Sequence, residues 1–209
     1  MPAIGAYETE LHESFDFALR EAGAYFMKQG RLRETLLRLA ARLDDEGISC
    51  ALVGGMALGE HGYVRMTEDI DILLSPRGLE LFRERLVGRG YVSTPPGAER
   101  AFRDAESGVR IEVLVSGDFP GDGKPKPVSF PDPARVAIEV DDLRVLSLAA
   151  MLDLKLASGM SAPHRLRDLA DVQETIKARH LDESFATQLD PSVREKYLEL
   201  YRAVRDAGV

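Results

Sequence analysis

The sequence predicts an α/β protein whose strand-rich core carries helical segments at both ends. Three observations predict it: apolar residues recur at helical spacing near both termini, strand-like alternation fills the middle, and glycine or proline separates the elements. Residues 1–46, 47–145 and 146–209 are accordingly expected to form an N-terminal helical segment, an α/β core and a C-terminal helical segment packed on that core.

Composition limits the classes of protein to consider. With 209 residues, the chain is long enough to bury a sizeable core. Its net charge of −8 argues against binding nucleic acid over its whole surface, because proteins that do so are usually basic. No run has the roughly 18 apolar residues that a membrane-spanning helix needs, and the N-terminus lacks a secretory pattern. The single cysteine, Cys50, excludes an internal disulfide and suits a reducing compartment. We therefore expect a cytoplasmic protein with no membrane partner.

Two amphipathic helices are expected over about residues 7–46. Gly30 is expected to separate them, and Gly47 to end the second. Each helix has an apolar stripe at spacings of three and four that we expect to pack on the core. The stripes consist of Phe15, Leu19, Ala22 and Phe26 in the first helix, and of Leu32, Leu36, Leu39 and Leu43 in the second.

The middle of the chain alternates strands with short helices, and helices follow it. A loop rich in proline and glycine is expected at 118–133. The expected strands are 48–53, 66–74, 91–94, 100–104, 109–115, 136–140 and 143–145. The expected helices are 56–62, 77–90, 147–159, 164–180 and 192–206.

Two carboxylates interrupt the apolar strand DIDILL at 69–74. Because side chains alternate along a strand, Asp69 and Asp71 point the same way, while Ile70 and Ile72 point into the core. Paired carboxylates repel and are costly to bury unless a positive charge lies between them. Oxygen ligands at this spacing suit Mg²⁺. The alternative is an edge strand whose acids face water.

A third acid is placed in the same way. Glu112 alternates with apolar residues in RIEVLV, on a strand that can lie beside the first, although Asp104, Glu106 and Asp118 are nearby competitors for the role. Three carboxylates on adjacent strands can hold two metal ions about 4 Å apart, which activate a hydroxyl and stabilise a departing pyrophosphate.

A glycine pair precedes the acids. Gly54 and Gly55 follow the strand ALV and precede an expected helix. Without Cβ atoms they let backbone N–H groups approach a ligand, and the positive end of a following helix favours phosphate. The alternative is a tight turn without a ligand.

The glycine turn and the acids together resemble the DNA polymerase β-like nucleotidyltransferase superfamily. Its signature is G-[GS], an interval, D-x-D and a later third carboxylate. In this sequence thirteen residues separate the glycine pair from Asp69-Ile70-Asp71, and Glu112 follows.

The resemblance is closer to the small bacterial group of AbiEii-type toxins and antibiotic-modifying nucleotidyltransferases. Their motifs GG-x-A and R-x-T-x-D-I-D match residues 54–57 and 65–71. Their helical lysine and R/K-D-x-x-D segment match Lys155 and residues 167–171. The resemblance covers about residues 48–176.

The resemblance implies a nucleotidyltransferase fold, a mixed β-sheet flanked by helices, with an NTP held between the sheet and the helices that follow. It implies that Gly54 and Gly55 contact the phosphates and that Lys155 meets the triphosphate. It also implies three metal-binding acids, of which the third helps to activate the acceptor hydroxyl: Asp69, Asp71 and Glu112.

Four further residues are candidates for nucleotide binding. Arg65 and Thr67 lie in the D-I-D motif, and Arg65 either pairs with a phosphate or caps the strand. Asp168 and Asp171 either orient Lys155, bind the base or sugar of the nucleotide, or are ordinary acids on a helix surface. The alternative for Lys155 is an exposed lysine on a helix.

Three function classes follow. The leading one is a Mg²⁺-dependent nucleotidyltransferase that moves an NMP from ATP or another NTP to a small hydroxyl compound, a tRNA end or a protein hydroxyl. Four arginines on one expected helix either offer a basic path for RNA or form an ordinary solvated face: Arg77, Arg83, Arg85 and Arg89. The alternatives are a non-catalytic nucleotide-binding or toxin–antitoxin interaction module with the same fold, and a metal-dependent phosphoester hydrolase. An antitoxin or a second copy of the chain is a possible partner.

Overall fold

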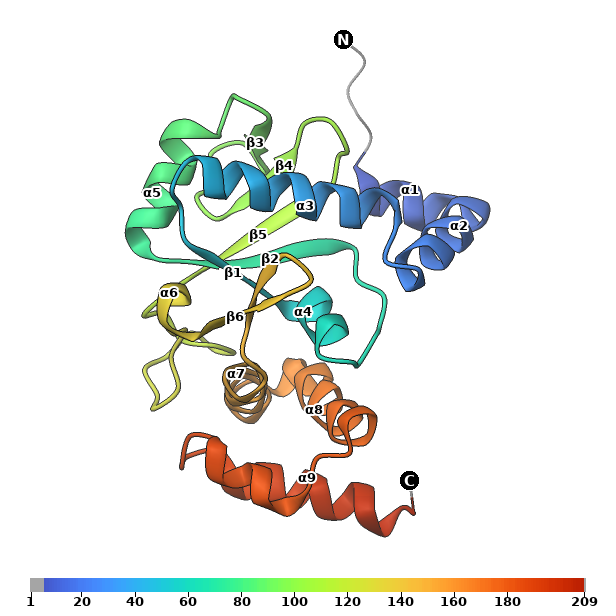
Figure 1. The fold of residues 1–209 in the computed structure, drawn as a ribbon, viewed down its shortest axis with the longest axis vertical. Helices are drawn as coiled ribbons and strands as arrows, with labels where there is room; N and C mark the ends of the chain where they lie inside the picture. The colour runs from blue at the N-terminus through green and yellow to red at the C-terminus, as the bar shows by residue number, and fades with distance from the viewer. Residues whose placement is uncertain (1–5, 209) are drawn as a thin grey trace.

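The computed structural model describes residues 6–208, which form a seven-stranded mixed sheet with helices on both faces (Figure 1). The mixed α/β architecture expected from the sequence is confirmed. The strands are β1 (Cys50–Val53), β2 (Asp69–Leu74), β3 (Tyr91–Ser93), β4 (Ala101–Asp104), β5 (Arg110–Val115), β6 (Ala137–Val140) and β7 (Leu143–Leu146). The helices are α1 (Tyr7–Glu13), α2 (Phe15–Phe26), α3 (Gly30–Asp45), α4 (Gly54–Glu60), α5 (Pro76–Arg85), α6 (Pro133–Val136), α7 (Leu148–Ser161), α8 (Leu166–Arg179) and α9 (Arg194–Asp206).

The strand order β3-β4-β5-β2-β1-β7-β6 places β2 at the centre of the sheet. β2 runs parallel to β5 and antiparallel to β1. In the parallel pair, Asp71 lies opposite Glu112 and Asp69 lies opposite Arg110. The two acid-bearing strands are therefore direct neighbours, in a register that puts the second and third acids side by side.

The two faces of the sheet have different covers. On one face, α3 packs on Leu52 and Ile72, and Phe82 of α5 packs on Tyr91 and Phe102. On the other face lie α7 and α8, with α9 outside them (Figure 1). Because alternate residues of β2 face opposite sides, Ile70 and Ile72 are buried under α3 while Asp69 and Asp71 face α7.

The expectation for the N-terminal segment is wrong in two respects. Three helices rather than two precede β1, because Ser14 ends α1 and its side chain accepts a hydrogen bond from Phe17 N to begin α2. The stripe predicted to be buried on the first helix is exposed instead: Phe15, Leu19 and Phe26 are 79%, 61% and 59% exposed. The leucine stripe of α3 is buried, as expected.

Most other expected elements are confirmed, with boundaries that differ by a few residues. The helix expected over 164–180 begins at Leu166, because a short 3₁₀ turn occupies Pro163–Arg165. The helix expected over 77–90 ends at Arg85. Among residues 6–208, no helix is both long and apolar enough to cross a bilayer.

Candidate functional site

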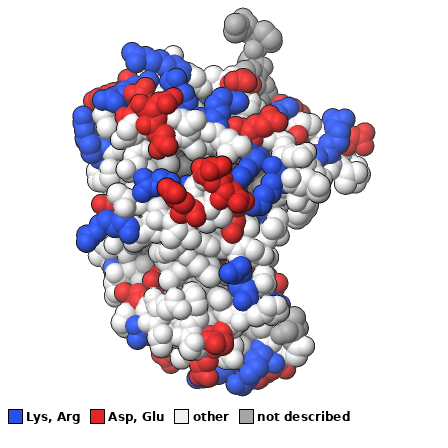
Figure 2. Space-filling view, viewed as in Figure 1, with Lys and Arg blue, Asp and Glu red and all other residues white. Residues whose placement is uncertain are grey.

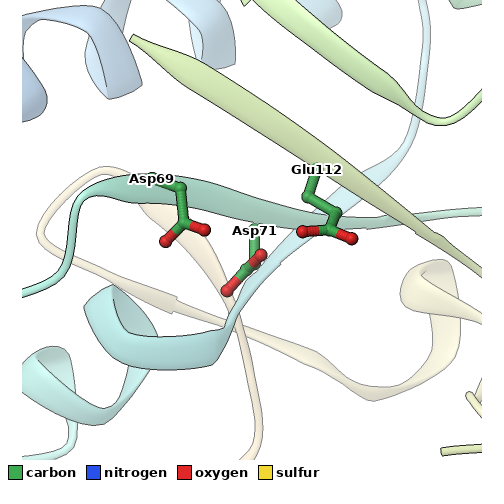
Figure 3. A group of neighbouring side chains, drawn as sticks. All are labelled: Asp69, Asp71 and Glu112. Carbon is green, nitrogen blue, oxygen red and sulfur yellow. The ribbon is translucent and has the colours of Figure 1, made fainter. Parts of the chain in front are cut away.

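Three carboxylates converge on the α7-facing side of the sheet. Asp69 and Asp71 extend from β2 and Glu112 extends from β5, all from the same face (Figure 3). One carboxylate oxygen of each lies within 4.8 Å of the others. Within the part of the chain that the structure describes, no other group of three His, Cys, Asp or Glu side chains has this arrangement.

Asp71 is the most perturbed of the three acids. Burial, followed by the negative charges of Asp69 and Glu112, raises the pKa of its carboxyl to about 7, although Lys155 and Arg65 oppose the shift. Among the described residues, no side chain donates a hydrogen bond to Asp71. Hard oxygen donors crowded together are the donor set that Mg²⁺ prefers, and the basic contact that the described residues give this group is the 3.4 Å approach of Arg110 to Glu112, so the residues present fit this ion.

Gly54 is required where it stands. Its φ of +67° lies in the left-handed region, and a Cβ built on it would lie 2.0 Å from Asp71 Oδ2. A side chain at this position would therefore both strain the backbone and displace the central carboxylate. The turn between β1 and α4 thus packs its backbone directly against the acids.

Gly55 brings a second part of the chain to the same place. A Cβ here would lie 3.0 Å from Thr67 Cβ and 3.2 Å from Arg65 Nη1, so both side chains lie against the glycine backbone. Thr67 Oγ1 donates a hydrogen bond to Asp69 Oδ1 at 2.8 Å. The threonine expected to bind nucleotide therefore orients the first acid of the triad.

Asp171 organises the basic side of the site. It is 2% exposed and accepts hydrogen bonds from Arg65 Nε at 2.8 Å, from Arg65 Nη2 at 3.0 Å and from Lys155 Nζ at 2.7 Å. This carboxylate gives a charged partner to the buried ammonium of Lys155 and to the partly buried guanidinium of Arg65. Arg65 therefore has a carboxylate partner on α8 rather than a partner at the end of the strand, and its expected contact with a phosphate stays a prediction.

Lys155 is held from two sides. It is 8% exposed, which overturns the alternative of an exposed helical lysine, and its second partner is Asp168 Oδ1 at 2.9 Å. Asp168 also accepts a hydrogen bond from Ser158 Oγ at 2.6 Å. Burial alone would raise the pKa of Asp168, but Lys155 and the Ser158 hydrogen bond hold it below its ordinary value.

A cleft of about 410 Å³, open to solvent, joins the acids to the basic side chains. Asp171 lies behind its wall, where it holds Arg65 and Lys155. Sequence reasoning assigned no role to Ser158, which lies one helical turn after Lys155 on α7 and could have been found from that spacing. The predicted site residues that line the cleft are Gly54, Gly55, Arg65, Thr67, Asp69, Asp71, Glu112, Lys155 and Asp168.

The arginines of α5 do not provide a path to this cleft. α5 packs through Phe82 on the opposite face of the sheet. Arg77 and Arg85 are paired with Glu80 and Glu46. On the side of the molecule drawn in Figure 2, basic and acidic side chains are interspersed. Of the two alternatives for these arginines, the solvated face describes α5, because its paired arginines lie on the face of the sheet away from the cleft.

Comparison with protein families gives one match that spans most of the chain. Residues 8–201 match the family described as "Uncharacterised nucleotidyltransferase". No curated protein matches the chain.

Solved structures with a similar arrangement include two proteins of low sequence identity. ANT(2″)-Ia, solved with adenylyl-2″-tobramycin, is 13% identical and aligns over 84% of this chain and 98% of its own, with a TM-score of 0.47. JHP933 from Helicobacter pylori is 17% identical and aligns over 82% of this chain and 88% of its own, with a TM-score of 0.44.

Proposed function

The chain belongs to the family of uncharacterised nucleotidyltransferases, and on this premise we propose that it moves a nucleoside monophosphate from an NTP to a hydroxyl acceptor and releases pyrophosphate. The observation that carries the proposal is the convergence of Asp69, Asp71 and Glu112 beside the Gly54 turn. Glycine backbone, acids and buried cations in one cleft are the parts that phosphoryl-group chemistry needs, since it depends on position and charge neutralisation.

The acids would hold Mg²⁺, and the resemblance of the motifs implies two ions. Bound Mg²⁺ neutralises phosphate charge and makes a coordinated hydroxyl more acidic. The support in this chain is the raised pKa of Asp71 together with the 4.8 Å grouping of oxygens, because such a cluster gains stability when a cation enters it.

The cations on the other side of the cleft would hold the triphosphate. Arg65 Nη1 is the guanidinium nitrogen that lies against Gly55, while Nε and Nη2 are engaged by Asp171. The nitrogen next to the glycine turn thus has donor capacity to spare. Lys155, oriented by Asp168 and Asp171, adds a second positive charge in the same cleft.

The reaction follows from these positions. The acceptor hydroxyl oxygen forms a bond to the α-phosphorus, and the bond from that phosphorus to the bridging oxygen of pyrophosphate breaks. The bridging oxygen keeps the electron pair and leaves with pyrophosphate, whose charge Arg65 and Lys155 offset. Glu112 receives the proton of the attacking hydroxyl, because it is the acid at the open side of the triad.

Transfer of label tests the proposal. Purified protein is incubated with Mg²⁺ and each of the four α-labelled NTPs, together with total RNA and a panel of small hydroxyl compounds. We expect label to move onto one acceptor class and pyrophosphate to appear. Asp69→Ala and Asp71→Ala should abolish transfer, whereas Asp45→Ala, which removes an exposed acid at the end of α3, should not.

Two outcomes would identify a different function. Nucleotide binding without transfer, unchanged in Asp69→Ala, would indicate a non-catalytic nucleotide-binding or interaction module. Release of inorganic phosphate or of a cleaved diester, with no pyrophosphate, would indicate a phosphoester hydrolase.

A further inference from the structure

The face of the sheet that carries the acids continues past Glu112 onto β4 and β3. Ala101 of β4 lies opposite Glu112, and Arg103 lies opposite Arg110. Val92 of β3 lies opposite Arg103. Residues opposite one another in antiparallel strands point to the same face. Their side chains therefore form a surface beside the triad, which we call the β4–β5 shelf (Val92, Ala101, Arg103 and Arg110).

The β4–β5 shelf is open at Val92 and Arg110, whereas α1 covers Arg103. Val92 is 45% exposed and the Arg110 side chain is 44% exposed, but the Arg103 side chain is 14% exposed beside Glu8. On the reverse side, Phe102 and Tyr91 are 0% and 2% exposed, under Phe82. Arg110 is therefore a solvent-accessible arginine next to the triad.

The two arginines of the β4–β5 shelf differ in the hydrogen bonds that they make. Arg103 makes two hydrogen bonds to Glu8 of α1, at 2.6 and 2.9 Å, and a third to the carbonyl of Gly108. For Arg110, the contact that the described residues provide is a 3.4 Å approach of Nη2 to Glu112 Oε2. A guanidinium has five N–H donors, so Arg110 has capacity for a ligand at the edge of the triad.

We propose that Arg110 binds a phosphate of the acceptor, so that the acceptor is a hydroxyl compound carrying a phosphate close to the hydroxyl that attacks. The proposal rests on the proposed function and deepens it. Arg110 and Glu112 are two residues apart on one strand, so their side chains lie on the same face, and Arg110 Nη2 lies 3.4 Å from Glu112 Oε2. A hydroxyl at Glu112 and a phosphate at Arg110 can therefore belong to neighbouring groups of one acceptor.

Residue chemistry supports this class of acceptor. The planar guanidinium of an arginine can donate two parallel hydrogen bonds to two oxygens of one phosphate, which the ammonium group of a lysine cannot do. Occupation of the acids by Mg²⁺ would compete for the Glu112 carboxylate and release its weak contact with Arg110. A polycationic acceptor would instead bring an ammonium group against this guanidinium. Sugar phosphates and the 3′ end of an RNA share the required chemistry.

Pairs of acceptors that differ by one phosphate test whether Arg110 binds a phosphate of the acceptor. With the NTP that the protein uses, transfer is measured to a hexose and its phosphate, to a ribonucleoside and its 5′-monophosphate, and to an RNA oligonucleotide with a free 3′ hydroxyl. We expect wild type to prefer the phosphorylated member of at least one pair by about tenfold or more, as charged hydrogen bonds allow. Arg110→Ala should reduce this preference to near unity, and Arg110→Lys should restore part of it.

Two controls separate this role from others. Arg77→Ala removes an arginine of α5, on the reverse face of the sheet, that also pairs with a glutamate. This variant should keep the wild-type preference for phosphorylated acceptors. Calorimetric affinity for NTP should be the same in Arg110→Ala as in wild type, and affinity for Mg²⁺ should not fall, because the variant loses the cation that competes for Glu112. The RNA and sugar-phosphate results distinguish the two sources of the phosphate.

The proposal is overturned if Arg110→Ala slows transfer to both members of a pair equally, which would mean that the arginine only positions Glu112. It is also overturned if wild type transfers label only to acceptors without phosphate, an outcome that leaves the nucleotidyltransferase function intact. Absence of transfer from any NTP to any acceptor would contradict the proposed function, and this assignment with it.

Discussion

Arg65 and Asp171 are 106 residues apart in the sequence and form a two-bond ion pair, with nitrogen–oxygen distances of 2.8 and 3.0 Å. The same carboxylate accepts from Lys155 at 2.7 Å. Through this contact, α8 holds both a loop residue before β2 and a residue of α7. A buried acid on a third segment therefore joins the two cations in the basic wall of the cleft, and Asp168 on the same helix adds a second contact to Lys155.

Removing that acid should destabilise the whole protein. Asp171→Ala leaves the partly buried guanidinium of Arg65 without its carboxylate partner and leaves the buried Lys155 with Asp168 alone, so we expect the free energy of unfolding to fall by about 3 kcal/mol. Urea titration measures it. Asp45→Ala, which removes an exposed acid, should stay within about 0.5 kcal/mol of wild type. A loss under about 1 kcal/mol in Asp171→Ala would show that the network has no such role.

The Gly54 turn can be tested against a glycine with the same backbone. Gly54 and Gly123 have φ of +67° and +71°, but a Cβ on Gly123 would have no atom within 4 Å. Gly123→Ala should therefore cost only the backbone strain, about 1–2 kcal/mol. Gly54→Ala adds a collision with Asp71, so we expect a larger loss in urea titration and a loss of Mg²⁺ affinity by calorimetry. Equal behaviour of the two variants would contradict the close contact.

The crowded acids should cost stability in metal-free protein. Asp71→Asn removes the central negative charge and keeps the shape, so in EDTA we expect the variant to be more stable than wild type by roughly 1–3 kcal/mol. Added Mg²⁺ should raise the melting temperature of wild type but not of Asp71→Asn. Calorimetric unfolding with and without Mg²⁺ checks both statements. A destabilised variant would mean that Asp71 has a structural partner.

The buried carboxyl of Asp153, which lies away from the site, predicts that the stability of the protein depends on pH. Burial raises the pKa of its carboxyl to about 6, although its Oδ1 accepts a hydrogen bond from Asp190 N at 2.9 Å. Because this folded-state pKa is above the unfolded value, its stabilising contribution is complete below about pH 4 and is lost as pH rises through 6.

Asp153→Asn keeps an acceptor for Asp190 N and cannot ionise. At pH 7.5 we expect it to exceed wild type in stability by about 1 kcal/mol, with partial exposure taken into account, and to lose this advantage at pH 4. Urea titrations at the two pH values measure the difference. If Asp153→Asn exceeds wild type in stability by the same amount at both pH values, ionisation of Asp153 is not the cause.

The exposed stripe of α2 predicts a contrast between two leucines. Leu39 of α3 is 0% exposed, so Leu39→Ala should cost about 2–5 kcal/mol. Leu19 of α2 is 61% exposed, so Leu19→Ala should change stability by about 0.5 kcal/mol or less. Denaturation of the two variants side by side is the measurement. Similar losses would indicate that α2 is covered in solution.

Some features of the site could be predicted from local patterns. Alternation in DIDILL and RIEVLV places Asp69, Asp71 and Glu112 on one face of their strands, because the side-chain period of two is a property of each strand alone. The same reasoning could have found Arg110, two residues before Glu112. A period of 3.6 likewise identifies the apolar stripe of α2, but it does not tell whether another element covers that stripe.

Periodicity alone was enough to predict that Asp69 and Asp71 share one face of β2, that Glu112 alternates with apolar residues on β5, and that the leucines of α3 form one stripe. Packing was needed to bring Asp71 opposite Glu112, to join Arg65 to Lys155 through Asp171, and to put α5 on the reverse face. These two kinds of feature depend on interactions of different range. Periodicity is set by neighbouring residues, whereas register and buried ion pairs depend on segments that meet only when the sheet and its helices are packed.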